Sequence, residues 1–128
     1  MTDHDALVSD LQTIAGDAIL GIGVYDGGDY DVLFINDDFA ERYAQDRLDE
    51  IARDMYLEGV SVEYQQQMLS DMGDLNATVR LFEGATSINV PLSESAGVGV
   101  GLDGAATISM VGDIVDRCVA FRETWRGE

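Results

Sequence analysis

Residues 96–102 alternate strictly between glycine and aliphatic side chains, and this alternation constrains the fold more than any other feature of the sequence. Successive side chains of a β-strand point to opposite faces, so the segment predicts a strand with one bare face and one apolar face. The bare face carries Gly97, Gly99 and Gly101, and the apolar face carries Val98, Val100 and Leu102. Glycine inside a strand is unfavourable by itself, which indicates that something approaches the bare face closely.

Residues 18–25 have the same design on a smaller scale. We expect one face to carry Leu20, Ile22 and Val24, and the other to carry Ile19, Gly21, Gly23 and Tyr25. The next four residues, Asp26-Gly27-Gly28-Asp29, are a strong turn signal because glycine accepts the positive φ that tight hairpin turns need. Residues 18–25 and 30–35 are therefore predicted to form a β-hairpin.

The remaining elements follow from hydrophobic periodicity. Helices are predicted from about residue 7 to a stop at Gly16, from 39 to a stop at Gly59 with a break near 44–46, and from 61 to 73. Strands are predicted over 75–82 and 86–90, and a last helix over 108–125. The order α-β-β-α-(α)-β-β-β-α predicts an α+β fold, a single five-stranded antiparallel sheet flanked by helices. We expect one domain over 1–128, with residues 1–5 as a mobile N-terminal extension.

The charge of the chain excludes several classes of partner. Asp and Glu number 25 against seven basic residues, all of them Arg, which gives a formal net charge of −18. A surface of this sign repels the phosphate backbone of DNA or RNA, so a nucleic-acid partner is not expected. An anionic membrane surface is disfavoured for the same reason.

The distribution of the acidic residues predicts a habitat. Asp outnumbers Glu 17 to 8, Lys is absent, and the acids run from Asp3 to Glu128, as expected for adaptation to a salt-filled cytoplasm. A functional acidic surface is the alternative. The lone Cys118 fits a reducing compartment, and the N-terminus lacks the pattern of a signal peptide, so a cytoplasmic protein is predicted.

Candidate catalytic groups are sparse. The only histidine, His4, falls in the predicted extension, and Cys118 lies on an apolar helix face, which is typical of a small buried hydrophobe. The acids around residues 26–31 and 36–38 do not have the spacing of a calcium-binding loop. We therefore predict no catalytic residue, no metal site and no cofactor, and a protein that is not an enzyme.

The element order resembles that of the roadblock/dynein-light-chain family, small domains of the profilin-like type. Three segments, Phe34-Ile35-Asn36-Asp37-Asp38, Tyr56-Leu57-Glu58-Gly59 and Thr78-Val79-Arg80-Leu81-Phe82-Glu83, also resemble a family of small uncharacterised haloarchaeal proteins. The roadblock resemblance implies a homodimer that acts as a scaffold or regulator, with the central helix and a sheet edge forming the self-contact. It also implies that the two glycine-bearing strands are neighbours, so that Gly21, Gly23, Gly97, Gly99 and Gly101 merge into one bare patch.

Two candidate sites result. The self-contact is predicted at Phe39, Tyr43, Arg47, Leu48, Ile51 and Met55, because Tyr and Arg are enriched where proteins bind one another. The alternative is that these side chains face the protein's own sheet. The glycine patch is expected either to receive a tightly packed helix or to hold a ligand in a shallow pocket.

The function predicted from these features is a non-enzymatic interaction or regulatory module that self-associates as a homodimer. Another protein is a further candidate partner. A small-molecule sensor with its ligand over the glycine-rich sheet face is the second hypothesis. An uncharacterised hydrolase is the third.

Overall fold

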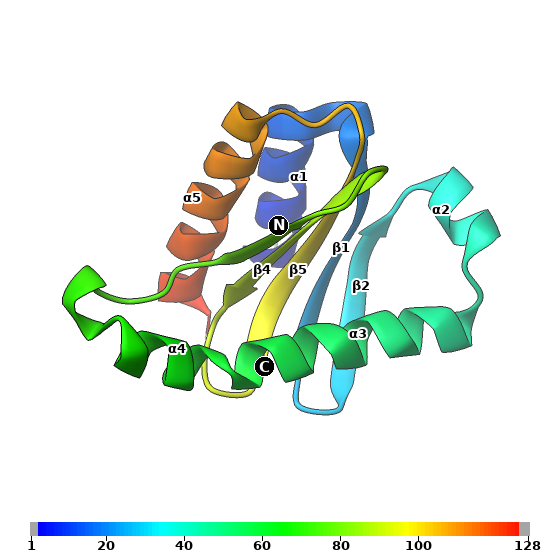
Figure 1. Cartoon of the computed structure of the whole chain (residues 1–128). Coiled ribbons are helices and arrows are strands. Elements are labelled where there is room, and N and C mark those ends of the chain that lie inside the picture. The colour runs from blue at the N-terminus through cyan, green and yellow to red at the C-terminus, as the bar shows by residue number, and fades with distance from the viewer. Residues whose placement is uncertain (1–2, 126–128) are drawn as a thin grey trace.

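A five-stranded antiparallel sheet forms the centre of the computed structural model, which describes residues 3–125 (Figure 1). The strands lie in the order β2-β1-β5-β4-β3. Their bounds are β1 Ile19–Asp26, β2 Asp29–Ile35, β3 Thr78–Leu81, β4 Ala85–Pro91 and β5 Ala96–Asp103. The predicted fold class is confirmed, including the hairpin, whose turn places Gly27 at a φ of +61°.

Helices cover both faces of this sheet. The helices α1 (Asp3–Ala15) and α5 (Ile108–Thr124) lie side by side on one face. The other face carries α2 (Asp37–Arg42) and α3 (Gln45–Val60), and α4 (Val62–Met68) continues from α3 beyond the sheet (Figure 1). Short 3₁₀ turns follow α1 and α4, at Gly16–Ala18 and Ser70–Met72.

The hydrophobic core lies between the sheet and the α1–α5 pair. Val98 and Val100 of β5 are fully buried there, as are Leu7 of α1 and Ile114 of α5. Cys118 is also fully buried, as the apolar spacing of its helix predicted. Burial raises the pKa of its thiol to about 12, so this cysteine stays protonated and is a packing residue.

The predicted faces of β1 are wrong at two residues. The register between β1 and β5 shifts between Ile19 and Gly21, so that Ile19 opposes Leu102 and is buried in the core. Leu20 becomes the extra residue, and its Cβ lies beside the glycine face at Gly101. An irregularity of this kind reverses the side-chain alternation on one side of it, and simple periodicity cannot detect it.

The helix boundaries also differ from the predictions. Residues 3–5 form the start of α1, where the His4 ring lies 5.7 Å from the Phe121 ring, and only positions 1–2 of the expected extension lie outside the described residues. The predicted break near 44–46 is present, because Tyr43 and Ala44 have extended backbone conformations.

Two other predicted boundaries differ by a few residues. Gly59 does not end α3, which continues to Val60. The strand predicted from residue 75 begins at Thr78.

Candidate functional site

The two glycine-bearing strands are neighbours at the centre of the sheet. Gly21 pairs with Gly101 and Gly23 pairs with Gly99 across the β1–β5 ladder. Since paired residues point to the same face, these four positions leave one side of the sheet without side chains. The adjacency implied by the roadblock resemblance is therefore present in the structure.

Gly97 belongs to a different environment. Tyr25 lies opposite it, and a Cβ added at Gly97 would overlap the Tyr25 hydroxyl. The glycine is needed there because the end of the tyrosine ring occupies the place that a side chain at Gly97 would take. The bare patch therefore consists of Gly21, Gly23, Gly99 and Gly101, without Gly97.

The helix above the patch touches it at Gly99. A Cβ at this position would lie 3.4 Å from Cε of Met55 on α3, so the tight helix packing expected of the patch is present here. At Gly23 and Gly101 the nearest described atoms within 4 Å come from the sheet itself, the Asp31 carbonyl at 3.3 Å and the Leu20 Cβ at 3.8 Å. Close packing by α3 therefore does not account for these two glycines.

A cleft of about 630 Å³ occupies the space between the glycine face and the α2–α3 segment. The six residues predicted as a self-contact line this cleft: Phe39, Tyr43, Arg47, Leu48, Ile51 and Met55. Phe39 and Tyr43 have ring centroids 4.3 Å apart, and the Arg47 guanidinium lies 5.7 Å from the Tyr43 ring centroid. The two predicted sites are thus opposite walls of one cleft.

A buried asparagine attaches α3 to the sheet at one end of this cleft. Asn89 of β4 is 2% exposed; its Nδ2 donates to the Met55 carbonyl and to Glu58, both at 2.9 Å. The Tyr25 hydroxyl donates to Asn89 Oδ1 at 2.8 Å, and burial raises the pKa of Tyr25 to about 12. Sequence reasoning missed Asn89, although a lone amide within the apolar run Ile88–Val90 was a usable signal.

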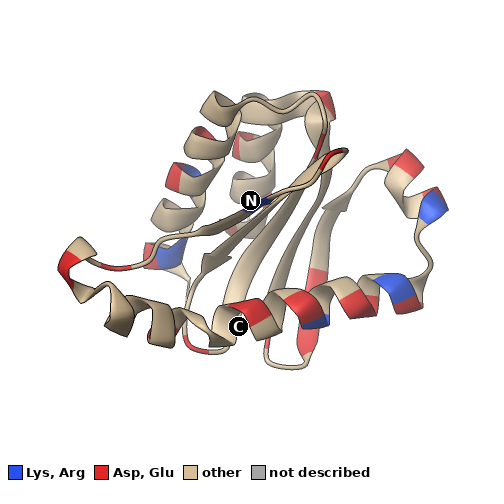
Figure 2. Cartoon of the chain, in the orientation of Figure 1, with Lys and Arg blue, Asp and Glu red and all other residues tan. Residues whose placement is uncertain are grey.

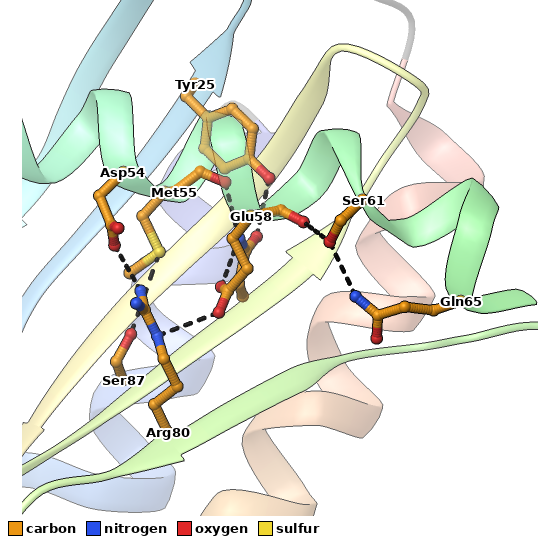
Figure 3. Close-up of polar contacts among 9 residues, drawn as sticks. Tyr25, Asp54, Met55, Glu58, Ser61, Gln65, Arg80 and Ser87 are labelled. Atoms are coloured by element: carbon orange, nitrogen blue, oxygen red, sulfur yellow. Dashed lines mark hydrogen bonds and ion pairs between the residues drawn. The ribbon is translucent and has the colours of Figure 1, made fainter.

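Ionic contacts extend this attachment to the edge strand. Arg80 of β3 donates to Asp54, and its Nε lies 3.0 Å from a carboxylate oxygen of Glu58, both on α3 (Figure 3). The hydrogen bond to Asp54 raises the pKa of Arg80, which is therefore charged at every accessible pH. These contacts position the last two turns of α3 over β4 and β3.

The opposite end of α3 is attached to β2. The Tyr30 hydroxyl donates to Asp49, and Gln45 donates to both of these side chains. The hydrogen bond from Tyr30 lowers the pKa of Asp49, and the same bond raises the pKa of Tyr30. Helix α3 is therefore held at both ends, with the cleft beneath the part between them.

A second surface, which sequence reasoning missed, lies beyond the sheet. We define the α4 band as the exposed apolar residues Leu57, Val60, Tyr64, Met68, Leu69 and Met72, which are between 52% and 74% exposed. Residues 59–72 contain two acids, Glu63 and Asp71, and no basic residue, and this segment is largely without colour in Figure 2. Beyond it, β3 and the following turn expose Val79, Leu81 and Phe82. Large apolar side chains left exposed along one stretch of the chain are typical of interaction sites.

The described residues contain no group of three or more His, Cys, Asp and Glu side chains that could hold a metal ion. None of the described helices combines the length and the apolar composition that a membrane span requires.

Comparison with solved structures defines the class of fold. A roadblock/LC7 domain from Streptomyces avermitilis superposes with a TM-score of 0.59 at 15% identity, over 94% of this chain and 92% of that one. The gliding protein MglB from Thermus thermophilus gives a TM-score of 0.60 at 14% identity, over 96% and 90%. A structure described as MglB with tetrameric arrangement gives 0.62 at 16% identity, over 96% and 90%. The chain therefore has the roadblock/LC7 fold.

The family is given by sequence. The family described as "Domain of unknown function (DUF7522)" matches residues 5–123, and the chain belongs to it. A sequence comparison with curated proteins found no match.

Proposed function

We propose that this protein is a non-enzymatic interaction module that self-associates and regulates by binding other proteins. The observation that carries the proposal is the α4 band. Six large apolar side chains, each more than half exposed, lie together on a segment that contributes little to the core. A group of exposed apolar side chains on an otherwise strongly charged chain is typical of an interface, and we assign the α4 band to one.

The free edge of β3 extends this interface. β3 pairs with β4 alone, and its other edge has no strand beside it among the described residues. An open edge strand is a ready site for pairing with another chain. Apolar side chains next to it, Leu81 and Phe82, are 67% and 61% exposed. We therefore place the self-contact along the α4 band and the β3 edge.

The similarity of fold to roadblock/LC7 domains and to MglB, one structure of which is described as tetrameric, is consistent with this assembly. Fold similarity alone does not carry function, so the assignment rests on the surface. The six cleft residues predicted as the self-contact lie between α3 and the sheet, and we assign them a different role below.

Association should require salt. Two copies with a net charge of −18 each repel one another at low ionic strength, whereas at about 1 M salt the Debye length falls to about 3 Å and the repulsion is screened. The apolar band then supplies the attraction, which salt strengthens. This dependence agrees with the proposed salt-adapted cytoplasm.

Sedimentation velocity at 1–100 µM protein in 2 M KCl tests the proposal. We expect the wild type to be a dimer and the double variant Tyr64→Asp/Met68→Asp to be a monomer, with the dissociation constant raised at least tenfold. Both side chains are about two-thirds exposed, so the fold should be unaffected. Ile108→Asp is the matched control, because Ile108 is 73% exposed at the start of α5 on the other face. A wild type that stays monomeric throughout, or a double variant that still dimerises, would contradict the proposal.

A further inference from the structure

We infer that the cleft beneath α3 binds a small, uncharged, largely apolar molecule. The protein's own packing does not explain the whole bare floor of the cleft. A Cβ at Gly23 would lie a tight 3.3 Å from the Asp31 carbonyl, which accounts for that glycine. A Cβ at Gly101 would meet only the Leu20 Cβ, at an ordinary 3.8 Å, and Gly101 does not have a positive φ. Gly101 lines the cleft, so the space above it is available to something outside the chain.

The walls have the size and chemistry of a small-molecule site. Such sites commonly occupy roughly 300–1,000 Å³ and are lined mainly by apolar and aromatic side chains. The cleft measures about 630 Å³, with Phe39 of α2 and the following Tyr43 at one end and Leu48, Ile51 and Met55 along α3. A flat floor of backbone with aromatic rings at one end fits a planar apolar molecule.

The charge of the lining selects an uncharged ligand. Among the described residues that line the cleft, Glu50 and Asp54 are the carboxylates, and Arg47 and Arg80 balance them. Arg80 is already paired with Asp54 and Glu58, and Arg47 lies over the Tyr43 ring with Glu50 3.9 Å away. Because the charged groups of the lining balance and are paired with one another, no unpaired charge is left to compensate an ion for its lost hydration. An uncharged molecule does not have this cost.

The attachments of α3 favour a small molecule over a polypeptide. The helix is hydrogen-bonded to β2 through Tyr30 and to β4 through Asn89, and the Met55 side chain rests on Gly99 at the second of these attachments. A helix about 10 Å across could enter beneath α3 only if these contacts broke. A molecule one ring thick can lie on the glycine floor with the contacts intact.

Titration with N-phenyl-1-naphthylamine, a neutral planar fluorophore, in 2 M KCl tests the inference. We expect saturable fluorescence enhancement with one probe per chain. Gly101→Val places two methyl groups in the cleft from the floor, and Ile51→Trp fills it from α3. Each variant should weaken probe binding at least tenfold while keeping the circular dichroism spectrum of the wild type; Ile51→Trp carries the test if Gly101→Val lowers the melting temperature.

Two controls separate this site from the proposed interface. Tyr64→Asp/Met68→Asp and Ile108→Asp should both leave the probe affinity within twofold of the wild type, whatever the oligomeric state. The inference is overturned if the wild type shows no saturable binding, or if folded Gly101→Val and Ile51→Trp bind the probe as the wild type does. Loss of binding in Tyr64→Asp/Met68→Asp alone would place the probe on the α4 band and also overturn it.

Discussion

The two faces of the sheet differ in what the same strands present to their helices. Toward α1 and α5, β1 and β5 present Ile22, Val24, Val98 and Val100, which are between 0% and 7% exposed. Toward α3, the same strands present the four glycines of the patch, and Met55, 8% exposed, is the one buried residue of α3 among the described residues. One face is covered by a buried apolar core, and the other retains a cleft.

This difference indicates where stability and function lie. A strand that alternates aliphatic residues with glycine buries apolar surface on one face, which stabilises the fold, and leaves the other face available for binding. The α3 face is held by a few specific polar contacts, through Asn89 and Arg80 at one end and Tyr30 at the other. The fold can therefore tolerate changes on the α3 face that it would not tolerate on the core face.

The largest expected effect comes from truncating matched leucines on the two faces. Leu11→Ala removes a fully buried side chain between α1 and the sheet and should lower the free energy of unfolding by about 3–5 kcal/mol. Leu48→Ala, in a partly exposed residue that lines the cleft, should cost about 1 kcal/mol. Urea unfolding in 2 M KCl measures both. Equal losses would show that the α3 face is packed as tightly as the core.

A second effect concerns alkaline pH. Burial raises the pKa of Tyr25 from 10.0 in the unfolded chain to about 12, so the folded protein keeps a proton that the unfolded chain loses. Its contribution is complete below pH 10 and is lost as the pH rises toward 12, a fall of about 2–3 kcal/mol. Urea unfolding between pH 9 and 12 measures it.

Cys118 acts in the same direction from the core face, so the measurement belongs in a Cys118→Ala background. Tyr25→Phe in that background should lose stability near neutral pH, because Asn89 loses its hydrogen-bond donor, and should show a shallower alkaline decline. An unchanged alkaline slope in Tyr25→Phe would rule out the buried hydroxyl as its source.

The smallest effect compares two glycines on the same face of β5. Gly97→Ala forces the Tyr25 ring away and should destabilise the protein by about 1–3 kcal/mol. At Gly101 a Cβ meets Leu20 at an ordinary 3.8 Å, and Gly101→Ala should stabilise by about 0.5 kcal/mol, because alanine restricts the unfolded chain. Thermal unfolding of both variants tests the pair. If Gly101→Ala is as damaging as Gly97→Ala, folding alone requires the bare floor.

The local patterns of the sequence predicted most of the fold and the bare glycine face, whereas the α2–α3 residues that line the cleft were predicted as a self-contact. The alternation in 96–102 and the turn at 26–29 predicted β5 and the hairpin within one residue at each end. The bulge at Leu20 escaped prediction because it depends on how β1 pairs with β5, and not on its own period. The exposure of the α4 band was not predicted for a similar reason. Helical spacing in 62–69 indicates a helix with a buried face, and only the tertiary structure shows that the sheet does not extend beneath it.

By itself, the sequence determined which segments become strands and helices, which strand faces are apolar or bare apart from the start of β1, and the strongly acidic composition, because these are properties of a residue and its near neighbours. The tertiary structure alone decided that Gly21 meets Gly101, that Asn89 reaches the Met55 carbonyl, and that α3 stands over a cleft. Those features join residues up to about 80 positions apart, and their geometry depends on strand order and register, which local periodicity does not encode.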